Sequence, residues 1–384
     1  MLAVAILLLA GCASHNWWDT TRDPGGNEFA GLVDSDRARV LLADFLARGS
    51  ADARLANLTS PGVSADLRPR SRQGWIPDQA WLRERAGDVS IDFAALSFAE
   101  AIGADERSRA VQAVFDGSLR EGPARSRERL SQRGGFPFTV LFAPAWFYRS
   151  YPDNGSDFAR QRRLLDELGI PHRLIEVAES GSVEDNAATI AAAVREAGRK
   201  QETVILVSVS KSGAEVAFAL SRLLTPEEAA PVAGWLNAAG ALYGTPLADA
   251  ALRPPVSWMS RLVFAVAGWN RQGLKSMATT PSRKRLEGAR LPESIAVINL
   301  VAVPVSGSIG IQVVLGYNML HHHGPNDGVV LLADTVWPGG ANIVALGADH
   351  LLSSRQHEAH DMALLRAIQF AVRLHGTSAA RGGR

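Results

Sequence analysis

The sequence predicts an α/β fold built on a mostly parallel, doubly wound sheet, with a helical extension before it. From residue 135 onward, apolar runs of strand length alternate with segments of helical periodicity. Such alternation is typical of a parallel sheet covered by helices on both faces. Before residue 135 only helical spacing recurs, and no repeat or low-complexity segment interrupts the chain.

Composition places the chain among globular proteins. Of its 384 residues, 47% are hydrophobic and 21% are charged, which is not the composition of a disordered chain. With 40 basic and 39 acidic residues the net charge is +1, so the charge indicates no nucleic-acid partner. Cys12 is the one cysteine, which excludes an internal disulfide and a multi-cysteine zinc site.

The first residues predict a lipoprotein signal peptide. Leu2 to Leu9 form an apolar run of eight, shorter than the roughly 20 residues of a membrane span but long enough for a signal peptide. The run ends in Leu9-Ala10-Gly11-Cys12, which resembles the bacterial lipobox, where the cysteine is acylated. The resemblance implies a signal peptide and lipobox over residues 1–12, with Cys12 carrying fatty-acyl chains such as palmitate. A buried apolar segment is the alternative. Because the basic start of a signal peptide is missing, we expect the natural start to lie upstream.

Lipidation at Cys12 would anchor the protein in the cell envelope, because two acyl chains are enough for stable membrane binding. Ala13 follows the cysteine, and a non-acidic residue there favours the outer membrane in Gram-negative lipoproteins. Residues 13–134 predict a tether and then a helical extension, in which helical spacing recurs over 35–49, 78–85, 93–102, 106–115 and 125–130. No candidate nucleophile, base or acid stands in motif context there, so we expect the extension to be dispensable for chemistry.

The main domain is expected over residues 135–376, followed by a flexible tail at 377–384. Its predicted strands are Phe138–Ala143, Arg173–Val177, Thr203–Val209, Val232–Ala239, Ser294–Val303 and Asn342–Leu346. Its predicted helices are Phe158–Leu168, Val183–Ala197, Gly213–Leu223 and His357–Arg373. Short apolar runs indicate the strands, and apolar stripes at helical spacing indicate the helices.

A candidate nucleophile stands where one strand runs directly into a helix. The strand ending at Val209 is followed by small residues, which is the setting of a nucleophile elbow, G-x-S-x-G. Here the pattern is Ser208-x-Ser210-x-Ser212, with serine, the smallest polar side chain, at both glycine positions. Ser210 is the expected nucleophile. The alternative is that Ser208 or Ser210 only caps the helix.

An acid and a base follow the serine in the chain order Ser, acid, His that accompanies the nucleophile elbow. Asp327 lies in a turn before an apolar run, and His350 comes just after a short strand. Asp334 is a rival acid, less favoured because the run before it predicts a strand or loop. Asp349 is expected to fix the histidine loop rather than to serve as the acid.

Over about residues 136–376 the chain resembles the α/β-hydrolase superfamily, and within it the secreted bacterial lipases. The motifs that carry the resemblance are the elbow, the acid loop Gly324–Val330, the histidine loop Asp349-His350-Leu351 and the turn Gly244-Thr245-Pro246. The resemblance implies an α/β-hydrolase fold and a triad of Ser210, His350 and Asp327. Ser210 would attack an ester carbonyl, His350 would take its proton, and Asp327 would hold the imidazole.

The resemblance also locates an oxyanion hole, the pair of N–H groups that binds the developing negative charge. Residues 142–148 stand where the family has a His-Gly loop, with Pro144 and Ala145 in place of these two residues. The first donor is expected to be the Trp146 backbone, with Ala145 as the near alternative. The second is the backbone N–H of Lys211, which follows the nucleophile.

Residues 247–291 separate the elbow half from the acid half and are rich in apolar and aromatic residues. In this family such an insertion is a cap over the active site, which would suit an acyl or lipid-like substrate. The alternative is that these residues form one or two helices of the ordinary core.

Three consecutive histidines, His321–His323, raise the question of a metal site. They cannot all point one way on a strand or helix, and no cysteine or carboxylate pattern accompanies them. His357 and His360 lack the spacing of an H-E-x-x-H zinc helix. We therefore expect no metal, and the triad chemistry needs no cofactor.

These features predict a serine hydrolase that cleaves small-molecule or lipid carboxylic esters through an acyl-enzyme, at a membrane reached through the lipid anchor. An acyltransferase with the same triad is the first alternative, in which an alcohol replaces water. A non-catalytic envelope lipoprotein is the second, favoured by the altered glycine positions 145, 208 and 212.

Overall fold

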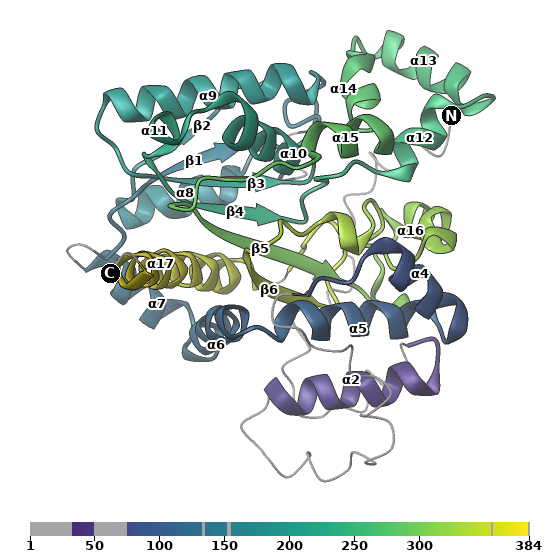
Figure 1. Cartoon of the computed structure of the whole chain (residues 1–384), viewed down its shortest axis with the longest axis horizontal. Coiled ribbons are helices and arrows are strands. Elements are labelled where there is room, and N and C mark those ends of the chain that lie inside the picture. The colour runs from purple at the N-terminus through teal and green to yellow at the C-terminus, as the bar shows by residue number, and fades with distance from the viewer. Residues whose placement is uncertain (1–32, 50–74, 133–134, 152–154, 355, 383–384) are drawn as a thin grey trace.

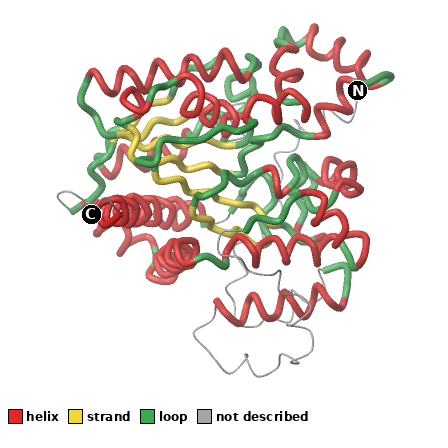
Figure 2. Tube along the Cα trace, viewed as in Figure 1, coloured by secondary structure: helices red, strands yellow, loops and turns green. Residues whose placement is uncertain are grey.

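The computed structural model describes residues 33–49, 75–132, 135–151, 155–354 and 356–382. The expected lipidation site, Cys12, and the tether as far as residue 32 lie outside the described residues. In the part that is described, a sheet of six strands stands between two layers of helices (Figures 1 and 2). No helix among these residues is long and apolar enough to cross a membrane.

The sheet has the strand order β2-β1-β3-β4-β5-β6, and every neighbouring pair is parallel. The strands are β1 (Thr139–Ala143), β2 (His172–Leu174), β3 (Val204–Val209), β4 (Val232–Ala238), β5 (Ala296–Val303) and β6 (Ala341–Leu346). Strand β1 lies between β2 and β3, so the chain runs from β1 to the edge strand β2, returns past β1 to β3, and then continues strand by strand to β6. Strands buried on both faces are apolar along their whole length, which is why short apolar runs predicted them.

Helices cover both faces of the sheet. On one face α9 (Val183–Arg199), α10 (Lys211–Phe218) and α11 (Pro226–Ala229) pack in one apolar cluster with β1, β3 and β4. On the other face a second cluster joins the strands to four helices: α6 (Glu106–Glu121), α7 (Pro123–Ser131), α8 (Ala159–Leu168) and α17 (His357–Gly382). Figure 1 shows α9 and α17 on opposite sides of the strands. The predicted class, a mostly parallel α/β sheet, is confirmed.

The N-terminal extension is built into the sheet. Helices α2 (Asp36–Gly49), α4 (Gln79–Asp88) and α5 (Ile91–Gly103) form an apolar cluster with β5 and β6. Because side chains alternate along a strand, Val301 and Val303 of β5 pack against these helices while Leu300 and Ala302 face the cluster that holds α17. The extension thus covers the part of the α9 face, over β5 and β6, that α9 and α10 do not reach.

Helix α6 also covers the edge of the sheet. The backbone N–H of Asn342 donates to Ser108 Oγ at 2.8 Å, and that of Val344 donates to Gln112 Oε1 at 2.8 Å. These are alternate residues of β6, and their acceptors lie four residues apart on α6. An edge strand with unpaired N–H groups is a template for aggregation, and α6 occupies the position of a further strand.

Some boundaries differ from those predicted. Helix α17 continues through Gly382, so most of the segment expected to be a flexible tail is helical. Strand β2 ends at Leu174, although Ile175 still donates to the carbonyl of Phe142 at 2.8 Å. The helix after the elbow begins at Lys211 and ends in a π-helical turn, η5 (Ala219–Leu223), where Leu224 donates to the carbonyl of Ala219.

The predicted cap segment consists of short helices: α12 (Pro246–Leu252), α13 (Val256–Val266), α14 (Arg271–Ser276) and α15 (Thr279–Leu286). They lie at the side of the molecule toward which the arrows of β4 and β5 point, together with α16 (Val314–Leu320) (Figure 1). Functional residues of parallel α/β folds gather at the carboxyl ends of the strands.

Candidate active site

Ser210 occupies a sharp turn between β3 and α10. Its backbone has φ 57° and ψ −124°, a positive φ that residues other than glycine rarely adopt. Such strain is held in place by the surrounding structure and clusters at functional sites. The Ser210 side chain makes no capping hydrogen bond to the helix, so the structure does not support the capping alternative for this residue.

The two serines that replace the motif's glycines are both buried and hydrogen-bonded. Ser208 Oγ accepts from Trp235 Nε1 at 2.8 Å. Ser212 Oγ donates to the carbonyl of Ala143 at 2.7 Å and accepts from the backbone N–H of Val209 at 2.9 Å. The hydroxyls therefore have partners, and the elbow tolerates serine at both positions.

The structure brings Ser210, His350 and Asp327 together in one chain of hydrogen bonds. Ser210 Oγ lies 2.9 Å from His350 Nε2, although 140 residues separate them. His350 Nδ1 lies 2.8 Å from Asp327 Oδ2. With the proton on Nδ1 facing the carboxylate, Nε2 is free to accept the serine proton. That tautomer follows from the partners.

The acid is fixed by its own loop. Asp327 is fully buried, and its Oδ1 accepts from the backbone N–H groups of Val329 and Val330 at 2.9 and 2.7 Å. The backbone N–H of His350 donates to the Asp327 carbonyl at 2.9 Å, so the two loops also hold each other. Asp349 accepts from the N–H groups of Gly310 and Leu351, both at 3.0 Å, and so fixes the histidine loop.

Electrostatics favours a charged imidazole at this position. Burial lowers the pKa of His350, but the charge of Asp327 and its hydrogen bond outweigh this, so the pKa of His350 lies above its ordinary value. The carboxylate therefore stabilises the imidazolium that forms when His350 accepts a proton.

The rival acid Asp334 lies elsewhere. It is in the short helix η8 (Leu332–Asp334), and its two carboxylate oxygens accept from Arg283 Nη2 of α15 at 2.9 and 3.0 Å. Burial raises the pKa of Asp334 and the Arg283 guanidinium opposes only part of this effect, so the pKa of Asp334 is about 6. Asp334 therefore joins the cap segment to the acid half of the sheet, while Asp327 has the hydrogen bond to His350.

The two backbone N–H groups predicted as oxyanion donors, those of Trp146 and Lys211, have no acceptor in the described residues. The near alternative is engaged, since Ala145 donates to the carbonyl of Ser156 at 3.0 Å. The next residue is engaged as well, because Phe147 donates to the carbonyl of Glu179 at 3.2 Å. Of the three N–H groups at 145–147, the Trp146 group is the one without an acceptor, as expected of a donor kept for an oxyanion.

Aromatic residues connect this oxyanion loop to the cap segment. The rings of Trp146 and Phe147 stack at 4.9 Å, and Phe147 lies 4.1 Å from the ring of Trp269. Phe264 of α13 completes the group at 6.3 Å from both Trp146 and Phe147. The surroundings of the oxyanion loop are therefore apolar on the side of the cap.

The sequence of three histidines forms the turn η7 (His321–His323), which follows α16. Among the residues that the structure describes, no three His, Cys, Asp or Glu side chains are grouped so that they could hold a metal ion. His360 lies in α17, and its Nδ1 is 2.8 Å from Ser354 Oγ.

One part of the site was not predicted. Lys211 and Glu215 form an ion pair that is buried beside the elbow, and Asn186 of α9 donates to the same carboxylate. A lysine and a glutamate four residues apart on a helix ordinarily indicate an exposed pair, so the sequence held no signal for this cluster.

The fold and the site together define a class: the chain has the α/β-hydrolase fold. Among solved structures it is similar to the metagenomic carboxyl esterase MGS0156, with a TM-score of 0.50 and 22% identity, over 62% of this chain and 76% of that one. The mature lipase BlEst2 of Bacillus licheniformis matches with a TM-score of 0.45 and 21% identity, over 56% and 85% of the two chains. No protein-family model matches the sequence. No curated protein matches it either.

Proposed function

We propose that the protein is a serine hydrolase that cleaves carboxylic esters. The observation that carries the proposal is the position of His350. Its Nε2 lies 2.9 Å from Ser210 Oγ, and its Nδ1 lies 2.8 Å from Asp327 Oδ2. A nucleophile hydrogen-bonded to a base, which is in turn hydrogen-bonded to an orienting acid, performs acyl transfer on several unrelated folds. The name of the similar structure, a carboxyl esterase, supports an ester as the substrate.

In the proposed mechanism His350 accepts the Ser210 proton as the serine oxygen attacks the ester carbonyl. The N–H groups of Lys211 and Trp146 donate to the oxyanion of the tetrahedral intermediate. His350 then gives the proton to the departing alkoxide, which leaves an acyl-serine. Water attacks the acyl group with His350 again as base, and His350 returns the proton to Ser210 Oγ as the carboxylic acid is released. Asp327 keeps the imidazole in the required tautomer throughout.

Apolar surface around the site supports an apolar acyl or lipid-like substrate. Half of the exposed large hydrophobic residues in the described part of the chain lie on α13, among them Trp258, Leu262 and Val266, which are 65%, 59% and 81% exposed. Leu351, next to the catalytic histidine of the proposal, is 44% exposed. Exposed apolar patches of this kind mark binding surfaces.

Hydrolysis of p-nitrophenyl esters from acetyl to decanoyl tests the proposal. We expect turnover that increases with acyl length, and no turnover above background for Ser210→Ala. A flat response to acyl length would remove the apolar-substrate part of the proposal. Absence of turnover over the whole series would favour a non-catalytic envelope protein.

We also propose that Cys12 is lipidated and anchors the protein in the cell envelope, on the outer membrane in a Gram-negative cell. The support is the lipobox-like segment that ends in Cys12. Metabolic labelling with an alkynyl fatty acid should mark the wild type and miss Cys12→Ser. Equal labelling of the two proteins would contradict the proposal.

A further inference from the structure

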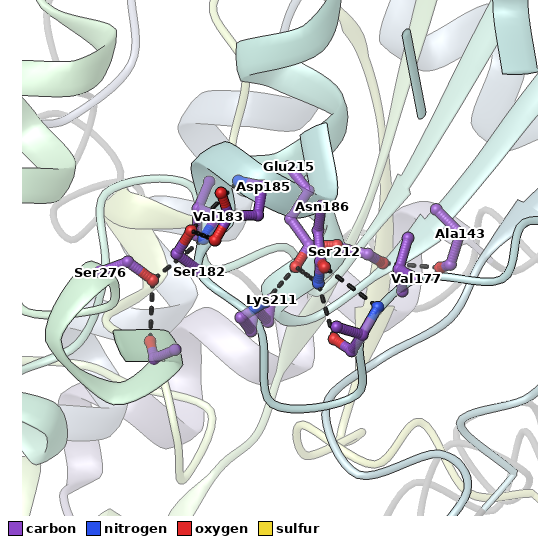
Figure 3. Close-up of polar contacts among 12 residues, drawn as sticks. Ala143, Val177, Ser182, Val183, Asp185, Asn186, Lys211, Ser212, Glu215 and Ser276 are labelled. Atoms are coloured by element: carbon purple, nitrogen blue, oxygen red, sulfur yellow. Dashed lines mark hydrogen bonds and ion pairs between the residues drawn. The ribbon is translucent and has the colours of Figure 1, made fainter. Parts of the chain in front are cut away.

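A buried ion pair lies directly beside the proposed nucleophile. The side chains of Lys211 and Glu215 are 3% and 1% exposed, and Lys211 Nζ donates to Glu215 Oε1 (Figure 3). Asn186 Nδ2 of α9 donates to the same oxygen at 2.8 Å. A buried ion pair is often no more stabilising than apolar residues of the same size. Stability alone therefore does not explain why charged side chains stand here.

Asn186 connects this pair to the loop between β2 and α9. Its Nδ2 donates to the carbonyl of Ala178 at 2.9 Å, and its Oδ1 accepts from the Ala178 N–H at 3.1 Å. The Asn186 amide therefore forms two hydrogen bonds with the backbone of Ala178, one as donor and one as acceptor. The loop cannot move relative to α10 without breaking these bonds or the bond to Glu215.

The same loop holds the oxyanion loop. The carbonyl of Glu179 accepts from the N–H of Phe147 at 3.2 Å. The Glu179 carboxylate accepts from the N–H groups of Arg149 and Ser150 at 3.1 and 2.8 Å, and from Ser150 Oγ at 2.6 Å. The bond to Glu179 fixes Phe147, the residue that follows Trp146. The Trp146 N–H itself has no acceptor among the described residues.

We infer that Lys211, Glu215 and Asn186 are positioning residues that set the distance between the two oxyanion donors. One donor is the Lys211 N–H, and the Lys211 side chain begins the series of contacts through its ion pair with Glu215. The other donor is the Trp146 N–H, and the contacts reach it through Glu215, Asn186, Ala178 and Glu179. The inference rests on the proposed hydrolase function. Donors must lie about 2.7–3.1 Å from the oxyanion, so small shifts of either loop lower the rate.

Asn186→Leu tests the inference, because it removes the connection with a side chain of similar size and leaves the Lys211–Glu215 pair in place. We expect kcat to fall roughly 100-fold, comparable to the loss of one oxyanion donor, and KM to stay within about 3-fold. The affinity for phenylboronic acid, whose tetrahedral serine adduct places an oxygen in the oxyanion hole, should fall in parallel with kcat.

Asn342→Leu is the matched control. Asn342 is also a buried asparagine: its Nδ2 donates to the carbonyl of Ile102 at 2.9 Å, and its Oδ1 accepts from Asn299 at 2.9 Å. We expect a comparable fall in Tm but unchanged kcat and boronate affinity. Equal losses of kcat in the two variants, or an unchanged kcat in Asn186→Leu, would overturn the inference.

Glu179→Ala keeps the test open if Asn186→Leu does not fold. Glu179 is only half-buried, so the variant should keep the wild-type Tm within a few degrees. It keeps the carbonyl bond to Phe147 but loses the carboxylate bonds to Arg149 and Ser150 that hold the oxyanion loop, so we expect kcat to fall about 3- to 10-fold with unchanged KM. Unchanged kcat in Glu179→Ala would contradict the inference. A wild type without turnover and without boronate binding would instead remove the proposed function, and the inference with it.

Discussion

Ser212 donates its hydroxyl to the carbonyl of Ala143 at 2.7 Å and so ties the nucleophile elbow to the end of β1. The same oxygen accepts from the N–H of Val209. Glycine, the residue that the elbow motif ordinarily has at this position, can make neither bond. A departure from the motif thus forms a cross-connection between β1, which leads into the oxyanion loop, and the turn that holds Ser210.

Restoring the motif should therefore weaken the protein. In Ser212→Gly, the N–H of half-buried Val209 and the carbonyl of buried Ala143 lose the Ser212 hydroxyl, and an unpaired buried polar group costs about 1–3 kcal/mol. Glycine in the first turn of α10 adds backbone entropy to the unfolded chain. Urea unfolding should show a lower midpoint with an unchanged m-value. A variant as stable as the wild type would show that these hydrogen bonds contribute little.

The two candidate acids should behave differently. Asp327→Asn should lower kcat by up to roughly 10⁴-fold, because the amide favours the wrong tautomer of His350. Asp334→Asn should keep kcat near the wild-type value, since Asp334 pairs with Arg283 and not with the histidine. Steady-state kinetics on one ester measures both. A damaging Asp334→Asn beside an active Asp327→Asn would mean that the acid loop is wrongly assigned.

The pH profile should report the charge state of His350. Only the neutral imidazole can accept the serine proton, so kcat/KM should fall as the pH falls through the pKa of His350. Because Asp327 raises that pKa above its ordinary value, the midpoint of the acid limb should lie above about 6.5.

The residual activity of Asp327→Asn, measured at high enzyme concentration, supplies the control for the pH profile. Without the carboxylate charge, the midpoint should move to lower pH. A midpoint at or below 6.5 in the wild type, or one that does not move in the variant, would contradict the assigned role of Asp327.

The N-terminal extension should matter for stability more than for chemistry. Gln112→Ala leaves the N–H of Val344 on the edge strand without its acceptor, and we expect a loss of about 1–3 kcal/mol in the free energy of unfolding. The kcat should be unchanged, because α6 lies against β6 and away from the triad. Thermal unfolding and ester kinetics on the same preparation separate the two effects. A kcat that falls with unchanged Tm would assign the extension a direct part in the site.

The sequence predicted the strands and the three triad residues because these are local signals. Short apolar runs mark buried strands. Ser210 and His350 each follow one of these runs, and Asp327 stands in a turn before another apolar run. The end of α17 was missed because residues 377–382 are small, polar or glycine, a composition typical of a tail. Continuing a long helix that has already begun adds one hydrogen bond for each residue fixed, so weak helix formers can extend α17.

Contacts between distant segments could not be predicted in this way. That Gln112 meets the edge of β6, and that Asn186 meets Glu215, depends on how helices pack on the sheet. The spacing of apolar residues predicts which face of a helix is buried, but not which segment of the chain packs against that face. The burial of Lys211 has the same origin, since α9 packs against α10 and Asn186 of α9 donates to the carboxylate that pairs with Lys211.

Reaction with a fluorophosphonate tests the central claim most directly, because only a serine activated by its base is phosphonylated readily. The intact mass of the wild type should increase by one adduct, and peptide mapping should place that adduct on Ser210. Ser210→Ala should remain unmodified, and His350→Ala should react far more slowly, since triad members act as a unit. An adduct on another residue, or equal labelling of the wild type and Ser210→Ala, would contradict the assignment of Ser210 as the nucleophile.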